Sequence, residues 1–396
     1  MLETNSRTEP LQGERLSLGI AGLGNAGHAV LRDLDKVAGV ELVAVADVRN
    51  QALETFPKEN GMVRTYDSVA KMCGNEKVDA VWVATPTEFH TEHVITALER
   101  GKHVICEKPM ALSLDDCDRI IEAAEKNRLI LLMHSKAMDP PIVKMREVIA
   151  GGELGRVIQI NTWSYKGWLK SVRLPSEVDS ARGGGVLFRQ GPHQVDIVRA
   201  IGGGRVRSVR GTAGKWHPRF DTEGNFTAML EFEDGTPATL VFNGYGFFDT
   251  SELTWGIGEG GYQVSRQENS QADPQMPVDA SVRYSMPLRT ETRRRVGERK
   301  QPVYGLTLVS CEKGDMRQSP DGVYVYTRDG CREIPCPAFL DRGETLLKLV
   351  EAATEHRPVP TDGRWGKATL EVLLAILQSS REGREITLTH QVRSVA

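Results

Sequence analysis

The sequence predicts an α/β domain with a parallel sheet, followed by an α+β domain built on a large, mainly antiparallel open sheet. Three observations predict this fold class. The chain has 396 residues, which is longer than a domain with one hydrophobic core usually is. Apolar runs alternate with amphipathic stretches through the first third, as in βαβ units. Beyond about residue 138 many apolar residues instead recur at every second position, which is typical of antiparallel strands. We place the two domains at 1–137 and 138–396.

Short apolar runs mark the strands of the first domain. They are apolar on both faces, so we expect them to be buried between two layers of helices. The runs are 16–22, 41–47, 78–85, 103–109 and 129–135. Helices are expected over 91–100 and 113–127, the second with Ser113 as its N-cap.

The second domain is expected to begin with a helix over 140–150, which Gly151 and Gly152 end. A strand over 157–165 and a helix over 186–201 follow. Asp234-Gly235 lies between two alternating runs and predicts a β-hairpin. Further alternating runs predict more strands. Two amphipathic helices, at about 340–356 and 365–382, close the chain.

Residues 262–300 have no apolar period and are rich in Gln, Pro, Arg and Glu. We expect a flexible surface insertion there. The arginine run 293–295 has acidic residues around it, so we favour this interpretation over a nucleic-acid patch.

Charge and composition exclude several classes of partner. The net charge is −3, whereas nucleic-acid and membrane surfaces usually demand a basic face. We find no apolar run of about 18 residues and no apolar stretch typical of a signal peptide. The six cysteines form no C-x-x-C pair, and no cluster of ligands has metal spacing. We therefore expect reduced thiols, no metal and a cytoplasmic location.

A glycine-rich turn follows the first strand and opens a helix. Its glycines, Gly22, Gly24 and Gly27, have the G-x-G-x-x-G spacing of a dinucleotide-binding Rossmann domain. Gly22 permits the tight turn, Gly24 lets the backbone approach a pyrophosphate, and Gly27 lets helix and strand pack closely. Asn25 and Ala26 complete the cofactor-binding turn at the helix N-terminus.

The second strand ends in Asp47, about 20 residues further on, where a carboxylate can accept the ribose hydroxyls of NAD. A 2′-phosphate would meet its negative charge, so NAD is favoured over NADP. Arg49 could instead pair with that phosphate, which leaves NADP open.

Four further groups of residues carry a family resemblance. They are Ala84-Thr85-Pro86 with His90; Glu107-Lys108-Pro109; Gly183-Gly184-Gly185 with His193 and Asp196; and Pro358-Val359-Pro360 between the closing helices. On these residues the chain resembles the glucose–fructose oxidoreductase / inositol dehydrogenase (Gfo/Idh/MocA) family, from Leu16 to Leu388 apart from 262–300. Within that family it is most similar to bacterial 4,5-dihydroxyphthalate dehydrogenases, on 180–185, 188–194, 243–246 and 310–315.

The resemblance implies roles by position. Lys108 would hydrogen-bond the reacting hydroxyl, and His193 would act as general base, since its ordinary pKa suits proton removal at neutral pH. Arg182 and Asp196 would contact substrate. Thr85, Pro86, His90 and Glu107 would line the cofactor site, with Lys108 beside the nicotinamide.

One departure from the family points to the substrate. Sugar and polyol dehydrogenases of this family commonly carry an aspartate four residues before the histidine, where this chain has Arg189. A guanidinium grips carboxylates in a bidentate fork, so Arg189 favours an anionic substrate over a neutral sugar. The alternative is that Arg189 faces solvent or pairs with Asp196.

Together these features predict an NAD(P)-dependent oxidoreductase that transfers a hydride from a secondary alcohol, with a carboxylated cis-dihydrodiol as the favoured substrate. A dehydrogenase of a sugar, sugar acid or cyclitol is one alternative. A non-catalytic regulator that senses NAD or another ligand is a second, against which Lys108 and His193 argue. The resemblance also implies a homodimer or homotetramer built on the open sheet face.

Overall fold

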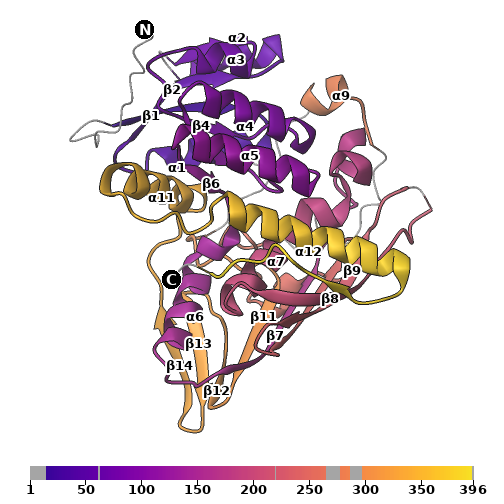
Figure 1. Ribbon diagram of the computed structural model, residues 1–396. Coiled ribbons are helices and arrows are strands. Elements are labelled where there is room, and N and C mark those ends of the chain that lie inside the picture. The colour runs from indigo at the N-terminus through magenta and orange to yellow at the C-terminus, as the bar shows by residue number, and fades with distance from the viewer. Residues whose placement is uncertain (1–14, 61–62, 219, 265–276, 286–296, 395–396) are drawn as a thin grey trace.

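The computed structural model describes residues 15–60, 63–218, 220–264, 277–285 and 297–394. It contains two sheets, each with helices packed against it (Figure 1). Both predicted sheet types are confirmed, because the first sheet is parallel throughout and the second is mainly antiparallel. In the described part of the chain, no helix is both long and apolar enough to cross a membrane.

The first sheet has six strands in the order β3-β2-β1-β4-β5-β6. Their bounds are β1 Leu16–Ala21, β2 Val40–Ala46, β3 Arg64–Tyr66, β4 Ala80–Val83, β5 His103–Cys106 and β6 Leu131–Met133. The helices between them are α1 Asn25–Leu34, α2 Asn50–Asn60, α3 Val69–Cys73, α4 His90–Glu99 and α5 Leu114–Asn127. As expected, Ser113 caps α5: its side chain accepts a hydrogen bond from the backbone N–H of Asp116.

The strand order positions the site. It reverses between β1 and β4, and ligands of open parallel sheets bind outside the carboxyl ends of strands at such a switch point. Gly22 follows β1, Thr85 lies just beyond β4, and Lys108 lies just beyond β5. These residues therefore share one edge of the sheet although they are far apart in sequence.

The second sheet has nine strands in the order β14-β13-β12-β11-β7-β10-β9-β8-β15. Their bounds are β7 Val157–Tyr165, β8 Val206–Gly214, β9 Asn225–Phe232, β10 Pro237–Asn243, β11 Leu306–Cys311, β12 Gly314–Gln318, β13 Gly322–Thr327, β14 Gly330–Pro335 and β15 Ile386–Thr387. β7 and β10 run parallel, and the other neighbours are antiparallel. The hairpin predicted at Asp234-Gly235 joins β9 to β10.

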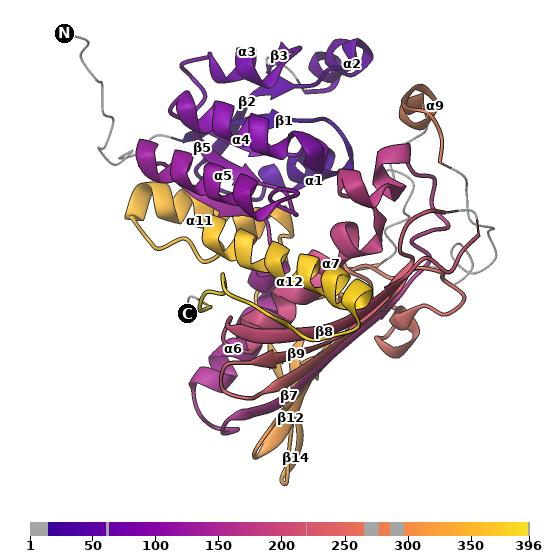
Figure 2. The same ribbon diagram turned by 45° about the vertical axis from the view of Figure 1, so that its right-hand side comes forward.

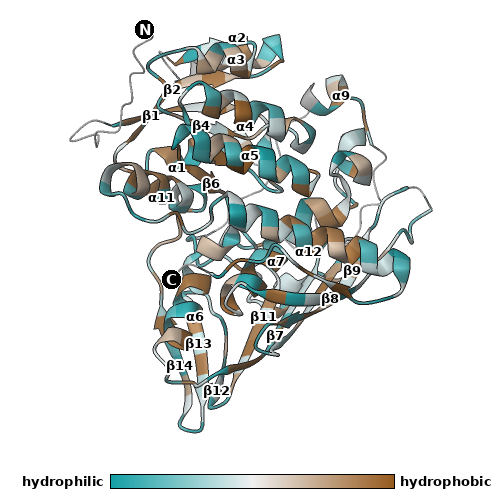
Figure 3. Cartoon of the chain, viewed as in Figure 1, coloured by the Kyte–Doolittle hydropathy of each residue, from teal (hydrophilic) through white to brown (hydrophobic). Residues whose placement is uncertain are grey.

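Helices cover one face of the second sheet and connect it to the first (Figure 2). They are α6 Pro140–Ala150, α7 Gly185–Ile201 and α12 Gly363–Glu382. α12 packs against α5, α7 and β8, so the buried apolar residues on one face of the first sheet join those of the second sheet in one cluster. The other face of the first sheet belongs to a separate cluster that includes residues of α1. In Figure 3 hydrophobic and hydrophilic stretches alternate along the helices, which is typical of helices that bury one side. The last helices thus return to the first sheet, where α11 Arg342–Glu355 also packs on α1.

The predicted insertion at 262–300 lies partly outside the described residues, which exclude 265–276 and 286–296. Its described portion includes the short helix α9 Ala280–Ser285. Near its end, Arg299 lies 3.5 Å from Asp33 of α1 and 3.6 Å from Asp341, the residue before α11, so this part of the segment contacts the adjoining ends of these two helices.

Candidate active site

The glycine turn after β1 has the shape a dinucleotide requires. Gly22 has φ +96°, and a Cβ there would lie 2.8 Å from the carbonyl oxygen of Ala84. At Gly27 a Cβ would lie 2.0 Å from the carbonyl oxygen of Gly22. Helix α1 can therefore pack this closely against the end of β1 only because residue 27 is a glycine. A Cβ at Gly24 would meet no described atom within 4 Å. Gly24 therefore leaves the N-terminus of α1, at Asn25 and Ala26, open to a pyrophosphate.

Asp47 follows β2 and lies against this turn. Its carboxylate accepts hydrogen bonds from the backbone N–H groups of Leu23 (2.8 Å) and Arg49 (2.9 Å) and from two guanidinium nitrogens of Arg49 (both 2.8 Å). Burial raises the pKa of Asp47, but these hydrogen bonds outweigh it and hold the pKa below its ordinary value. Asp47 and Arg49 thus form a hydrogen-bonded ion pair at the expected ribose position.

His90 joins the loops that follow β4 and β5. Its two ring nitrogens lie 2.9 Å from the carbonyl oxygens of Thr85 and Pro109. Thr85 in turn lies 3.0 Å from a ring nitrogen of His93. Because both ring nitrogens face backbone carbonyl oxygens, His90 can hold the Thr85-Pro86 loop in place. Neither nitrogen is left to contact a cofactor, so His90 would act on cofactor binding only through this loop.

Glu107 is buried and paired across the chain. An oxygen of its carboxylate lies 3.1 Å from a guanidinium nitrogen of Arg342 in α11. Burial raises the pKa of Glu107, but the charge of Arg342 outweighs it and the pKa falls to about 2. Glu107 therefore anchors the Lys108 loop as a fixed anion.

Lys108 points from that loop toward α7. Its amine donates a 2.9 Å hydrogen bond to the backbone carbonyl of Arg189. Burial, and next the charge of Arg189, lower the pKa of Lys108 to about 7. Lys108 can therefore be neutral near physiological pH, when it can accept a proton.

His193 lies one turn beyond Arg189 on α7 and is only 8% exposed. Its Nδ1 atom is buried and has no hydrogen-bond partner among the described residues. Burial, and then the charges of Lys108 and Lys136, lower its pKa well below the ordinary value. The ordinary pKa of histidine, from which we expected a general base, does not hold here because the ring is buried and, secondarily, because lysine charges lie near it.

Three residues that we did not predict from the sequence complete the environment of the His193 ring. The ring of Tyr304 packs edge-on against His193, with centroids 4.9 Å apart. The amine of Lys166 lies 4.4 Å from the centre of the Tyr304 ring. Lys136 is buried and lies 3.2 Å from Asp139. Both lysines come just after strands, β6 for Lys136 and β7 for Lys166, and this position was the available sequence signal.

Arg189 pairs with Glu177 at 3.0 Å and not with Asp196. The Arg189 side chain is 32% exposed, and the same Glu177 oxygen lies 3.7 Å from Arg173. Glu177 therefore holds the Arg189 guanidinium through one terminal nitrogen. Arg182 forms a two-point ion pair with Glu88 at 2.7 and 3.0 Å and is half exposed.

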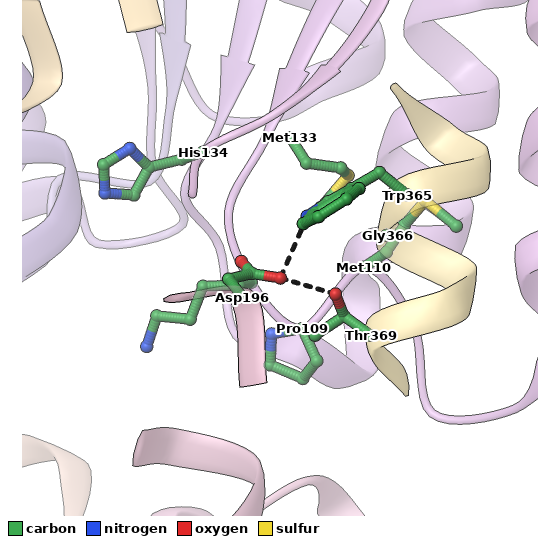
Figure 4. Close-up of a pocket in the computed structure, with 9 residues that line it drawn as sticks. Pro109, Met110, Met133, His134, Asp196, Trp365, Gly366 and Thr369 are labelled. Carbon is green, nitrogen blue, oxygen red and sulfur yellow. Dashed lines mark hydrogen bonds between the residues drawn. The ribbon is translucent and has the colours of Figure 1, made fainter. Parts of the chain in front are cut away.

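Asp196 is buried beneath the site. Its carboxylate accepts hydrogen bonds from Ser135 (2.6 Å), Trp365 (3.0 Å) and Thr369 (2.5 Å). Figure 4 shows it beside Trp365 and Thr369 in a small cavity that Lys108 also lines. Its oxygens are thus committed to the protein, which favours a role in holding α7 over direct substrate contact.

Comparisons with known proteins cover both domains. Residues 16–135 match the model described as "Oxidoreductase family, NAD-binding Rossmann fold", and residues 142–252 match the "GFO/IDH/MocA C-terminal domain". The chain is 28% identical to the 1-carboxy-3-chloro-3,4-dihydroxycyclohexa-1,5-diene dehydrogenase of Comamonas testosteroni, over 92% of this chain and 95% of that protein. It is 30% identical to the myo-inositol 2-dehydrogenase of Thermotoga maritima, over 49% of this chain and 57% of that protein.

A crystal structure of a protein assigned as a dehydrogenase, from Bordetella bronchiseptica RB50, is similar over the whole fold. The TM-score is 0.87 at 37% identity, and the match covers 94% of this chain and all of that one. The likeness therefore extends through the second sheet and the closing helices.

Proposed function

Since this chain belongs to the GFO/IDH/MocA oxidoreductase family and has its NAD-binding Rossmann domain, we propose that it oxidises a carboxylated cis-dihydrodiol to the corresponding catechol. One observation carries the proposal: Arg189 lies one helical turn before His193 on α7, and its guanidinium is partly exposed. The family resemblance implies an acid at this position in polyol-oxidising members. The Comamonas relative, whose name describes a carboxylated dihydroxy diene, supports the same substrate class.

Lys108 and His193 would share the proton chemistry. When bound, NAD supplies the acceptor for the hydride that leaves the carbinol carbon. The hydroxyl proton would pass to the Lys108–His193 pair, and a carbon–oxygen double bond would form as the hydride departs. The pKa of about 7 favours Lys108 as the acceptor, with the neutral His193 ring hydrogen-bonded to the same oxygen. Tautomerisation of the ketone to an aromatic catechol would make the reaction effectively one-way.

The carboxylate would bind on the cationic side of the pocket. Arg189 can offer a fork to a carboxylate while Glu177 holds its other side. Lys136 and Lys166 add positive charge near His193, although Asp139 and Glu259 each neutralise one of them in part. A substrate anion is therefore better matched to this pocket than a neutral polyol.

We further propose an assembly in which the open face of the second sheet binds another copy of the chain. Trp163 on β7 and Met229 on β9 point away from the helices and are 42% and 52% exposed. Burying such a face would protect both the apolar side chains and the sheet. Light scattering of the purified protein would report a dimer or tetramer, whereas a monomer would contradict the proposal.

A panel of alcohols with NAD+, followed by absorbance at 340 nm, tests the proposed reaction. The panel should contain a carboxylated cis-dihydrodiol, a hexuronate and myo-inositol. We expect NADH formation with the first, and its loss by about 100-fold or more in Lys108→Ala or His193→Ala. Turnover of the hexuronate or inositol alone would instead identify a sugar-acid or cyclitol dehydrogenase. NADH binding without turnover of any of them would favour a ligand-sensing regulator.

A further inference from the structure

A cis-dihydrodiol carries a second hydroxyl group next to the one that reacts. Lys108 and His193 are assigned to the reacting hydroxyl, and Arg189 to the carboxylate. The remaining hydroxyl loses its hydrogen bonds to water when the substrate binds, so it needs an acceptor in the protein. A site that supplies this acceptor can discriminate strongly against an alcohol that lacks the hydroxyl.

Several carboxylates near the pocket are already held by donors of the protein. Glu107 pairs with Arg342, Glu177 accepts from Arg189 and from the backbone N–H of Leu174, and Asp196 accepts three side-chain hydrogen bonds. The side chains of Glu107 and Glu177 are only 7% and 17% exposed. A substrate hydroxyl would therefore have to displace a buried partner from each of these groups.

Glu259 lies in a loop that the backbone fixes near the pocket. The carbonyl oxygen of Gly258, the residue before it, accepts a 3.2 Å hydrogen bond from the N–H of Val303. Val303 directly precedes Tyr304, whose ring packs edge-on against His193. The Glu259 backbone is therefore held close to the residue that contacts the His193 ring.

The side chain of Glu259 is directed to the same place by Lys166. The Lys166 amine lies 3.1 Å from a carboxylate oxygen of Glu259 and 4.4 Å from the centre of the Tyr304 ring, which in turn lies 4.9 Å from the His193 ring. The Glu259 side chain is 36% exposed, so a ligand can reach it. Burial lowers the pKa of Lys108, and the negative charge of Glu259 opposes this lowering, which places the carboxylate within electrostatic reach of the amine.

We propose that Glu259, positioned by Lys166, accepts a hydrogen bond from the hydroxyl that does not react and so makes the site selective for a vicinal diol, an inference that rests on the proposed function. A hydrogen bond from a hydroxyl to a carboxylate is stronger than one to a neutral acceptor. Together with the contacts at the reacting oxygen and at the substrate carboxylate, it gives three separate contacts to one ring. These three contacts fix which carbinol carbon faces the nicotinamide.

Equilibrium binding of three aromatic ligands to the NADH-loaded protein tests this inference without turnover. The ligands are 3,4-dihydroxybenzoate, 3-hydroxybenzoate and 4-hydroxybenzoate, which share the ring and the carboxylate. We expect the wild type to bind the dihydroxy ligand at least about tenfold more tightly than either of the others. Glu259→Ala should weaken the dihydroxy ligand by roughly 10- to 150-fold, the range for a hydrogen bond to a charged group, and change one monohydroxy ligand less than about threefold. Glu259→Gln keeps an acceptor without the charge and should lose less affinity.

A matched control and the contrary outcomes make the test specific. Glu252→Ala removes an exposed glutamate from the short helix η5 Thr250–Leu253, which precedes the same loop, and should leave all three affinities unchanged. If Glu259 serves only to neutralise Lys166, Glu259→Ala will change all three affinities by the same factor, which would overturn the inference. A wild type that binds the dihydroxy ligand no better than the others would also overturn it, and both outcomes leave the proposed function in place. A wild type that binds NADH but none of the three ligands would contradict the proposed function as well.

Discussion

Single residues in the pocket are tuned by their neighbours' charges. Burial alone disfavours a charged Lys108, and the adjacent Arg189 guanidinium adds to this, so that the pKa of Lys108 lies near 7. Glu107 and its negative charge act in the opposite direction. The arginine that we propose for substrate binding therefore also lowers the pKa of the Lys108 amine, which we propose as the proton acceptor.

The first prediction follows from this coupling. If neutral Lys108 accepts the proton, kcat at saturating substrate should fall as the pH drops below about 7. Arg189→Ala removes the neighbouring cation, so the pKa of Lys108 should rise and the acid limb of the kcat–pH profile should move to higher pH. Arg182→Ala, which removes an arginine paired with Glu88, serves as the control and should leave the limb in place. An unchanged limb in Arg189→Ala would exclude the coupling.

The sequence could indicate some of these residues and not others. Lys108 and His193 carry family motifs, and Arg189 is recognisable by its spacing from His193. Glu177 and Tyr304 have no such signal, because only tertiary packing brings them to α7. The depressed pKa of His193 could not be predicted either, since it depends on burial and on lysines from two other strand ends.

At the scale of elements, the turn from β1 to α1 contains one glycine that leaves space for a ligand and another that the packing of the fold requires. Gly24 is extended, with φ −83° and ψ −165°, a conformation open to any residue, and it has space for a Cβ. Gly27 has no such space, because a Cβ would collide with the Gly22 carbonyl. The two glycines therefore serve different purposes in one motif.

The second prediction uses this difference. Gly24→Ala should melt within a few degrees of the wild type but bind NADH at least tenfold more weakly, because its methyl group occupies the path of the pyrophosphate. Gly27→Ala should lower the free energy of unfolding by about 1–3 kcal/mol, the usual range for overpacking. Thermal melts and NADH titrations of both variants measure this. Equal loss of stability in the two variants would contradict the separate roles of Gly24 and Gly27.

Strands were predictable where their side chains are buried. β1, β2 and β7 have apolar runs or clear alternation, and the structure confirms them. β3 has only three residues, and β14 is exposed at nearly every position. Both form because a neighbouring strand offers backbone hydrogen bonds, which leave no apolar pattern in the sequence.

At the scale of the whole molecule, a buried ion pair ties helix α11 to the loop that follows β5 of the first sheet. Glu107 follows β5, Arg342 opens α11, and both side chains are largely buried. The two residues are far apart in sequence, and we did not predict their contact. It makes the position of the Glu107-Lys108 loop depend on a residue more than 200 positions further along the chain.

The third prediction concerns this pair. The folded-state pKa of Glu107 is about 2, below its ordinary 4.5, so the pair stabilises the fold above pH 4.5 and this contribution is lost as the pH falls toward 2. Arg342→Met leaves an uncompensated buried carboxylate and should lower the free energy of unfolding at pH 7 by about 3–5 kcal/mol. Adding Glu107→Gln should restore much of that loss. Denaturant titrations at pH 7 measure it, and a double variant less stable than Arg342→Met would refute this account.

The central claim is that the pocket selects a carboxylate next to a secondary alcohol, and one comparison tests it most directly. kcat/KM with NAD+ is measured for a carboxylated cis-dihydrodiol and for the same diol without its carboxylate, in the wild type and in Arg189→Ala. We predict that the wild type prefers the carboxylated diol and that Arg189→Ala raises the KM for this diol by roughly 10- to 150-fold, with little change in the KM for the neutral diol. A wild type that prefers the neutral diol, or an Arg189→Ala variant that keeps the full preference, would contradict the account.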